Sequence, residues 1–134
     1  ITPILENPTY FNIIPDTFTV DFPNTKSPFS SDFCLSANGV YNDLEIVLLP
    51  TGAARPGFDA DYKLIYKNKG NTKQSGNFAF YFNDDILDFV SASPSTVDQS
   101  KGQLFWNFSD LLPFESREIE IVLNLNSIFV PVIF

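Results

Sequence analysis

The sequence predicts an all-β protein, and more narrowly an antiparallel β-sandwich. Apolar and polar residues alternate in several runs, among them Tyr62–Lys67 and Phe78–Phe82, and a period of two is typical of half-buried strands. Clusters of turn-forming residues at 67–76, 91–102 and 111–116 separate these runs. Several short strands at this spacing are typical of an antiparallel sandwich.

Composition excludes several classes of protein. The chain has 134 residues, enough for one ordinary domain or for a small domain with part of another. Hydrophobic residues make up 44% of it, which argues against disorder. The net charge of −8 repels phosphate backbones, so we expect no nucleic-acid partner. We also expect no membrane insertion, because no apolar run reaches the roughly 18 residues that a spanning helix needs.

The chain divides into two units of unequal size. Residues 1–35 are rich in proline, and we expect strands at 10–14 and 17–22 that meet near Pro15. This piece is too small to bury a core of its own, so it is interpreted as the terminal strands of a preceding β domain. A polar linker with an Asn-Gly pair is predicted at 36–43. The larger unit is predicted to be a sandwich domain over 44–134.

The last eight residues form a strongly apolar tail, with the sequence SIFVPVIF at 127–134. They fit a final strand of the sandwich. Left unpaired, the same residues would be a point of association with another molecule. The sequence leaves open which of the two applies.

Alternation assigns the residues that should fill the space between the sheets. Large aromatic and aliphatic side chains recur on one face of each predicted strand, where each buries a large area. The predicted core and corner residues are Tyr62, Leu64, Tyr66, Phe80, Phe89, Trp106, Pro113, Ile119 and Ile121.

One acidic group offers ligands of the kind that calcium takes. Asn83, Asp84, Asp85 and Asp88 lie close together in the sequence, and calcium binds six to eight oxygen atoms. The group lacks the Asp-x-Asp-x-Asp-Gly spacing of a calcium loop, and it falls between two predicted strands. The interpretation that needs no metal is a charged turn that keeps a sheet edge soluble.

The aromatic residues offer a second kind of site, a stacking platform for sugars. We expect Trp106 to pack across the sandwich, because alternation places it on an inner face. Phe105 or Phe108 would then be exposed on the opposite face as a contact surface. This leaves carbohydrate binding, with or without calcium, as an alternative function.

The residue types present argue against catalysis. The chain has no histidine, so it can form neither a Ser–His nor a Cys–His pair, and it lacks the ligands of a zinc site. We therefore expect a non-enzymatic protein without a cofactor. Cys34 is the single cysteine; it pairs with a residue outside the segment, or it is a small buried apolar residue.

An ordered set of motifs in the larger unit resembles a family of bacterial surface repeats, the Ig-like "domain of unknown function eleven" group. The set comprises the Asn68-Lys69-Gly70 turn, the Ser-Ala-Ser-Pro turn at 91–94, the Trp106 strand, and the corner at 111–116 before a long alternating strand. The form with these flanking residues is similar to one found in large flavobacterial proteins exported by the type nine secretion system. Residues 1–35 resemble the end of a prealbumin-like or carboxypeptidase-regulatory-like domain.

The resemblance implies a function without a catalytic site. It implies a module of a large secreted or cell-surface protein, which spaces or presents the neighbouring domains of its own polypeptide and contributes to adhesion. An accessory module of a secreted hydrolase, which binds a surface glycan or a protein ligand, is the alternative. The chain lacks a methionine, which favours a mature fragment or an excised segment. The predicted location is extracellular.

Overall fold

The structure is a computed structural model that describes residues 1–127. A single turn of 3₁₀ helix, η1 (Pro8–Tyr10), precedes the first strand. The strands of the described residues are β1 (Phe11–Ile14), β2 (Cys34–Ala37), β3 (Leu44–Pro50), β4 (Asp59–Asn68), β5 (Gln74–Tyr81), β6 (Leu87–Ser93), β7 (Asp98–Ser100), β8 (Gln103–Leu111) and β9 (Ser116–Leu125). None of the described helices is long and apolar enough to cross a membrane.

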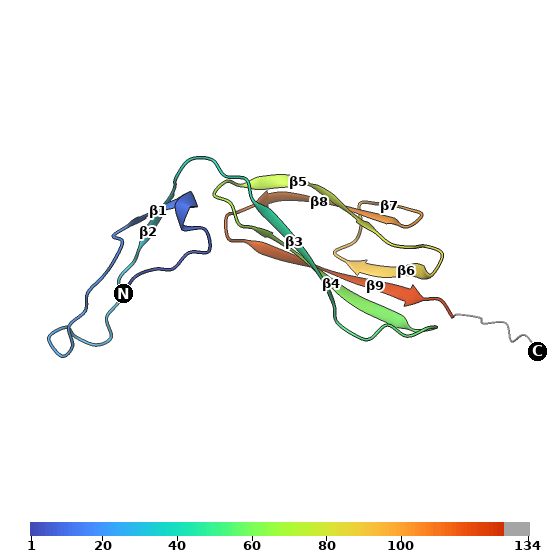
Figure 1. Ribbon diagram of the computed structural model, residues 1–134, viewed down its shortest axis with the longest axis horizontal. Coiled ribbons are helices and arrows are strands. Elements are labelled where there is room, and N and C mark those ends of the chain that lie inside the picture. Colours follow the sequence, from blue (N-terminus) through green and yellow to red (C-terminus); the bar gives the residue numbers. More distant parts are fainter. Residues whose placement is uncertain (128–134) are drawn as a thin grey trace, which may run out of the picture.

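Two antiparallel sheets face each other from residue 44 onward (Figure 1). One has the order β3-β4-β9-β6 and the other β5-β8-β7, and every neighbouring pair of strands is antiparallel. The prediction of an all-β protein with an antiparallel sandwich is confirmed.

The core of the sandwich is made by side chains from both sheets. Its buried members are Leu64, Leu104, Trp106, Ile119, Ile121 and Leu123. Trp106 lies against Phe78 with its ring 5.8 Å away, and its indole Nε1 donates to the carbonyl of Pro94 at 3.0 Å. That hydrogen bond satisfies the polar atom of a side chain that is 3% exposed, and it ties Pro94 to the core. The turn predicted at 91–94 is wrong, because residues 91–93 are the last three of β6 and pair with β9.

In the central strands, the apolar residues of the alternating sequence face the core and the polar residues face solvent. On β9, Ile119 and Ile121 are buried while Glu118 and Glu120 are exposed. A shift of one residue would place these glutamates between the sheets, so the burial pattern fixes the register with β4.

The first 37 residues form a separate small unit, which we call the N-terminal unit (Figure 1). Its sheet has two strands, with Phe11 opposite Ala37 and Ile14 opposite Cys34. None of residues 1–37 is buried. The chain then passes through a connector, residues 38–43, into β3.

The strand predicted at 17–22 is wrong. The partner of β1 is β2, and the ring of Phe18 instead packs edge-on against Phe29 and Phe33. Pro15 and Pro23 stand on either side of the segment 17–22, and a ladder cannot continue through them because neither has a backbone N–H. The three aromatic rings pack together without a ladder.

Two further expectations need adjustment. The linker predicted at 36–43 begins at residue 38, because Ser36 and Ala37 continue the ladder with β1. Cys34 is exposed, so its interpretation as a buried apolar residue is wrong; its sheet has two strands, and none of residues 1–37 is buried. The expected final strand at 127–134 lies, from residue 128 onward, outside the described residues.

Candidate functional site

The acidic residues proposed for calcium do not gather into a site. Asp84 and Asp85 lie in the turn between β5 and β6, and Asp88 lies on β6 itself. The side chain of Asn83 organises the turn by accepting a hydrogen bond from the amide of Asp85 at 3.0 Å. Among residues 1–127 no three acidic, cysteine or histidine side chains lie close enough to hold a metal.

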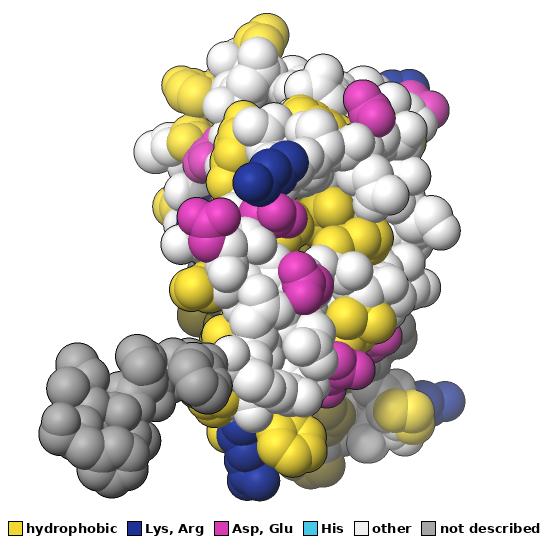
Figure 2. Space-filling view, turned by 90° about the vertical axis from the view of Figure 1, so that its right-hand side faces the viewer, with side chains coloured by type: hydrophobic (Ala, Val, Ile, Leu, Met, Phe, Trp, Pro, Cys, Tyr) yellow, Lys and Arg dark blue, Asp and Glu magenta, His cyan; other side chains and the backbone are white. Residues whose placement is uncertain are grey.

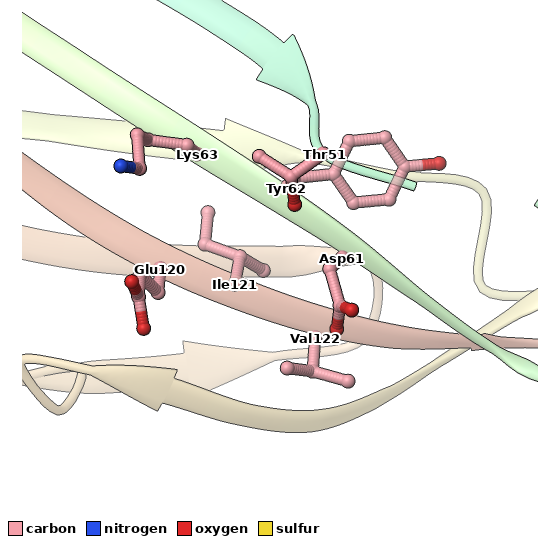
Figure 3. Close-up of a pocket in the computed structure, with 7 residues that line it drawn as sticks. All are labelled: Thr51, Asp61, Tyr62, Lys63, Glu120, Ile121 and Val122. Carbon is pink, nitrogen blue, oxygen red and sulfur yellow. The ribbon is translucent and has the colours of Figure 1, made fainter. Parts of the chain in front are cut away.

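A shallow depression of about 430 Å³ lies over β4 and β9 (Figure 3). Asp61, Lys63 and Glu120 come from the solvent-facing positions of the two strands and border it, with Thr51 just past the end of β3. Lys63 is already paired, since its Nζ lies 3.1 Å from the carboxylate of Glu118. The depression has charges of both signs and is open to water, so it lacks the convergent polar groups of a ligand site.

The two phenylalanines proposed as an exposed contact surface are both half-buried. Phe108 is two residues beyond Trp106 on β8, so its side chain points to the same face. Its ring packs 5.5 Å from that of Tyr66 on the inner face of the sandwich. The expectation of an exposed Phe108 on the opposite face is therefore wrong. Phe105 lies on the outer face, where it is paired with Ala79 of β5 and with Asp98 of β7.

The best-organised polar region of the described residues is the junction. We define it as the contact that the N-terminal unit and the connector make with residues 68–71 at the end of β4, with Glu45 of β3 and with Phe114 in the corner before β9. Asn68 is fully buried at its base. Its amide nitrogen donates to the carbonyls of Thr72 and Leu111, at 2.7 and 2.9 Å, and its oxygen accepts from the amide of Gly70. These bonds shape the loop from the sandwich side.

Asn71 faces the other way and joins three parts of the chain. Its amide nitrogen donates to the carbonyl of Tyr10 at 2.8 Å and to that of Gly39 at 3.1 Å. Its oxygen accepts from the amide of Tyr41 at 2.9 Å. Because Asn71 is 8% exposed, losing these partners would leave buried polar atoms unsatisfied.

Gly70 lets the connector approach the loop closely. A Cβ added to Gly70 would lie 2.3 Å from the carbonyl oxygen of Tyr41 and 2.8 Å from the amide nitrogen of Asp43. The amides of Lys69 and Gly70 both donate to the carbonyl of Asp43, at 2.8 and 3.1 Å. Only a residue without a side chain fits at this position.

Ion pairs cross the junction at its edge. The amine of Lys69 lies 2.9 Å from Glu6 and 3.1 Å from Glu45, and that of Lys67 lies 3.2 Å from Glu6. The hydrogen bonds from Lys69 and then Lys67 lower the pKa of Glu6, and those to Glu6 and Glu45 raise the pKa of Lys69. These groups are accessible to water, so salt screens them.

Aromatic rings complete the junction. Tyr10 stacks on Tyr41 with ring centres 4.3 Å apart, and its hydroxyl donates to Asp43 at 3.2 Å. Burial, followed by the charge of Asp43, raises the pKa of Tyr10. Phe11 stacks at 4.8 Å on Phe114, whose backbone lies in the left-handed region at φ 69°. The corner holds this strained residue through a hydrogen bond from its amide to the carbonyl of Asn68.

The predicted core residues lie at or against the core cluster, apart from Pro113, which is half-buried in the corner between β8 and β9. The junction was not predicted from the sequence. The Asn-Lys-Gly-Asn run at 68–71 was its visible signal, since two asparagines around a glycine favour a loop with side-chain hydrogen bonds. Glu6 gives no such signal, because its partners are about 60 residues away.

The end of the sandwich that lies away from the N-terminal unit carries acidic side chains interspersed with exposed hydrophobic ones (Figure 2).

Comparisons of the chain with models of protein families, with curated proteins and with solved structures give no match.

Proposed function

We propose that this chain is a non-catalytic structural module that holds its two units at a fixed relative orientation, and so spaces or presents neighbouring domains of a larger polypeptide. The observation that carries the proposal is the junction. A flexible tether needs no buried asparagine and no glycine against the connector, yet both are present.

The path of the chain supports the same function. The connector enters the sandwich at the junction, and β9 ends at the far end of the sandwich, so that the units lie end to end (Figure 1). A module of this form would hold the domains on its two sides at a set distance from each other. An Ig-like repeat of a secreted or surface protein, with the role in adhesion that the family resemblance implies, would need such a joint.

The distance between two spin labels tests whether the joint is rigid. Cys34 is exposed in the N-terminal unit and is the single cysteine of the sequence, so it takes one label without mutation. Gln99→Cys on β7 gives a second site in the sandwich. We expect a narrow distance distribution by double electron–electron resonance in the unmodified junction.

Matched glycine substitutions then test the cause. Gly70→Ala should broaden the distribution because of the close backbone contact, whereas Gly52→Ala, with nothing within 4 Å of the added Cβ, should leave it narrow. Asn71→Ala should also broaden the distance distribution, because it removes three hydrogen bonds across the junction. A broad distribution in the parent chain would refute the proposal, and so would a narrow one in both junction variants.

A further inference from the structure

Strand β3 is an edge strand whose apolar side chains are left uncovered on both faces. Leu44, Ile46 and Leu48 share the inner face with Leu64 and Tyr66 of β4, yet they are 49%, 54% and 45% exposed. Val47 and Leu49 on the outer face are also exposed. Such a run is typical of a strand buried on both faces, yet within residues 1–127 β3 has one sheet neighbour.

The other long edges of the sandwich carry features that discourage pairing. The ladder of β6 is broken by an irregularity between Phe89 and Ser91, and Asp88 is exposed on it. The ladder of β5 is broken between Gln74 and Gly76. Bulges and charges protect edges in this way. In β3 the register with β4 is unbroken, and Glu45 is its one charged residue.

A groove lies beside this edge, between the two sheets. It has a volume of about 220 Å³ and is lined largely by apolar side chains, with Leu44 and Ile46 on the β3 side and Phe78 and Phe108 on the other. A strand added outside β3 would hydrogen-bond to its free edge. The alternate side chains of that strand would then point over the groove.

The sequence contains one segment that matches this site. Residues 128–134, IFVPVIF, are seven apolar residues without a charge, and β3 is seven residues long. A strand apolar on both faces fits β3, which is apolar on both faces. Pro131 is compatible with an edge position, where its ring nitrogen faces away from the partner.

Residues 128–134 are too few to return to β3 of their own molecule and also pair along it. Pro50, at the end of β3, pairs with Tyr62, which in turn pairs with Ile121 of β9. Asn126 lies five residues beyond Ile121, and its amide still donates to the carbonyl of Ile86. From Asn126 the chain would have to run back about 17 Å along the sheet to become level with Pro50. It would also have to cross about 14 Å, or three strand spacings, to lie outside β3. Along the diagonal this takes roughly seven extended residues. Within residues 127–134 almost nothing would remain to pair.

We propose that β3 and its groove receive residues 128–134 of a second copy of this chain as an added strand. The donated segment and the accepting edge are different surfaces, so the contact is heterologous and repeats head to tail, as a closed ring or as an open series of copies. This assembly leaves the N-terminal unit and the buried asparagines of the junction in place, so it is independent of the proposed function.

Two variants that complement each other test the proposal. Phe129→Asp with Ile133→Asp removes the donor, and Ile46→Asp with Leu48→Asp removes the acceptor. We expect the average mass of the unmodified chain in sedimentation velocity to rise with concentration, and each variant alone to stay a monomer. An equal mixture of the two variants should give one 1:1 complex and nothing larger, because it contains one working pair.

Ile86→Asp with Val97→Asp is the matched control, since it places the same charges on exposed apolar residues away from β3. This control should associate like the parent chain. A donor variant that associates as strongly as the parent would overturn the proposal in favour of pairing between two β3 edges. If the acceptor variant does not fold, a peptide of residues 127–134 added to the donor variant decides the matter: slowed amide exchange in β3 supports the proposal, and unchanged exchange refutes it.

Discussion

The sandwich and the N-terminal unit are both β structure, but different contacts hold them. Up to residue 127 the sandwich has eight buried hydrophobic residues, which include the members of its core cluster, whereas the N-terminal unit has no buried residue. A two-stranded hairpin is at best marginally stable by itself. The N-terminal unit is therefore expected to depend on the junction, while the sandwich should fold without it.

The difference shows how a small piece of chain is held in place. At the junction the stabilising groups are polar and aromatic: the Asn71 amide, the Tyr10–Tyr41 stack and the ion pairs of Glu6. Such contacts are directional, so they fix an orientation at a modest gain in free energy. Four changes test this comparison, from the largest expected effect to the smallest.

Ile121→Ala should have the largest effect, because Ile121 is fully buried between the sheets. We expect the free energy of unfolding of the sandwich to fall by about 2–5 kcal/mol. The fluorescence of Trp106, the single tryptophan, reports this in a denaturant titration. Ile86→Ala, the same change at a residue that is 49% exposed, should cost far less. Equal losses at the two sites would contradict the packing of the core.

Asn71→Ala should release the N-terminal unit and leave the sandwich folded. Three hydrogen bonds are lost from a nearly buried amide, so docking should weaken by about 1–3 kcal/mol. Faster amide exchange in η1 and β1, with unchanged exchange in β9, is the expected signature. Asn77→Ala, at an exposed position of β5, is the control. Faster exchange in β9 as well would mean that the two units unfold together.

Phe11→Ala should have a smaller effect of the same kind. It removes the stack on Phe114, and an aromatic pair contributes about 0.5–1.5 kcal/mol beyond the area it buries. Methyl and aromatic NMR shifts at the corner would record the change. Phe18→Ala, within the N-terminal unit, should leave the shifts of Phe114 in place.

The ion pairs of Glu6 should give the smallest effect, and one that depends on pH. Its pKa in the folded chain lies below the ordinary 4.5, so its contribution is fully present above pH 4.5 and is lost as the pH falls through the lowered value. Protease cleavage between residues 15 and 33 should accelerate over that acidic range and with added salt. Glu6→Gln should weaken this pH dependence.

Glu115 also has a lowered pKa, and the hydrogen bond from Arg117 is the largest cause. Because Glu115 lies in the corner before β9, its titration should appear in the NMR shifts of β9.

The core was largely readable from the sequence, and the edge and the junction were not. Period-two patterns identify Leu64, Trp106 and Ile121 because alternation depends on local geometry alone. The strand predicted at 17–22 failed although its residues alternate; the prolines on its two sides, at 15 and 23, cannot donate to a ladder. The expectation of an exposed Phe108 failed although its parity with Trp106 is visible in the sequence, since two residues along a strand return a side chain to the same face.

The sequence by itself determined the all-β class and most of the residues between the sheets, because both depend on side-chain alternation within a few neighbours. The turn predicted at 91–102 was wrong in part, since residues 91–93 end β6 and residues 98–100 form β7. The tertiary structure alone decided that Asn71 would meet Tyr10, about 60 residues earlier, and that β3 would lie at an edge. Its apolar residues indicate an interior strand, yet strand order depends on which distant segments pair. Such long-range pairing leaves no periodic trace in either segment, so it can be read only from the folded chain.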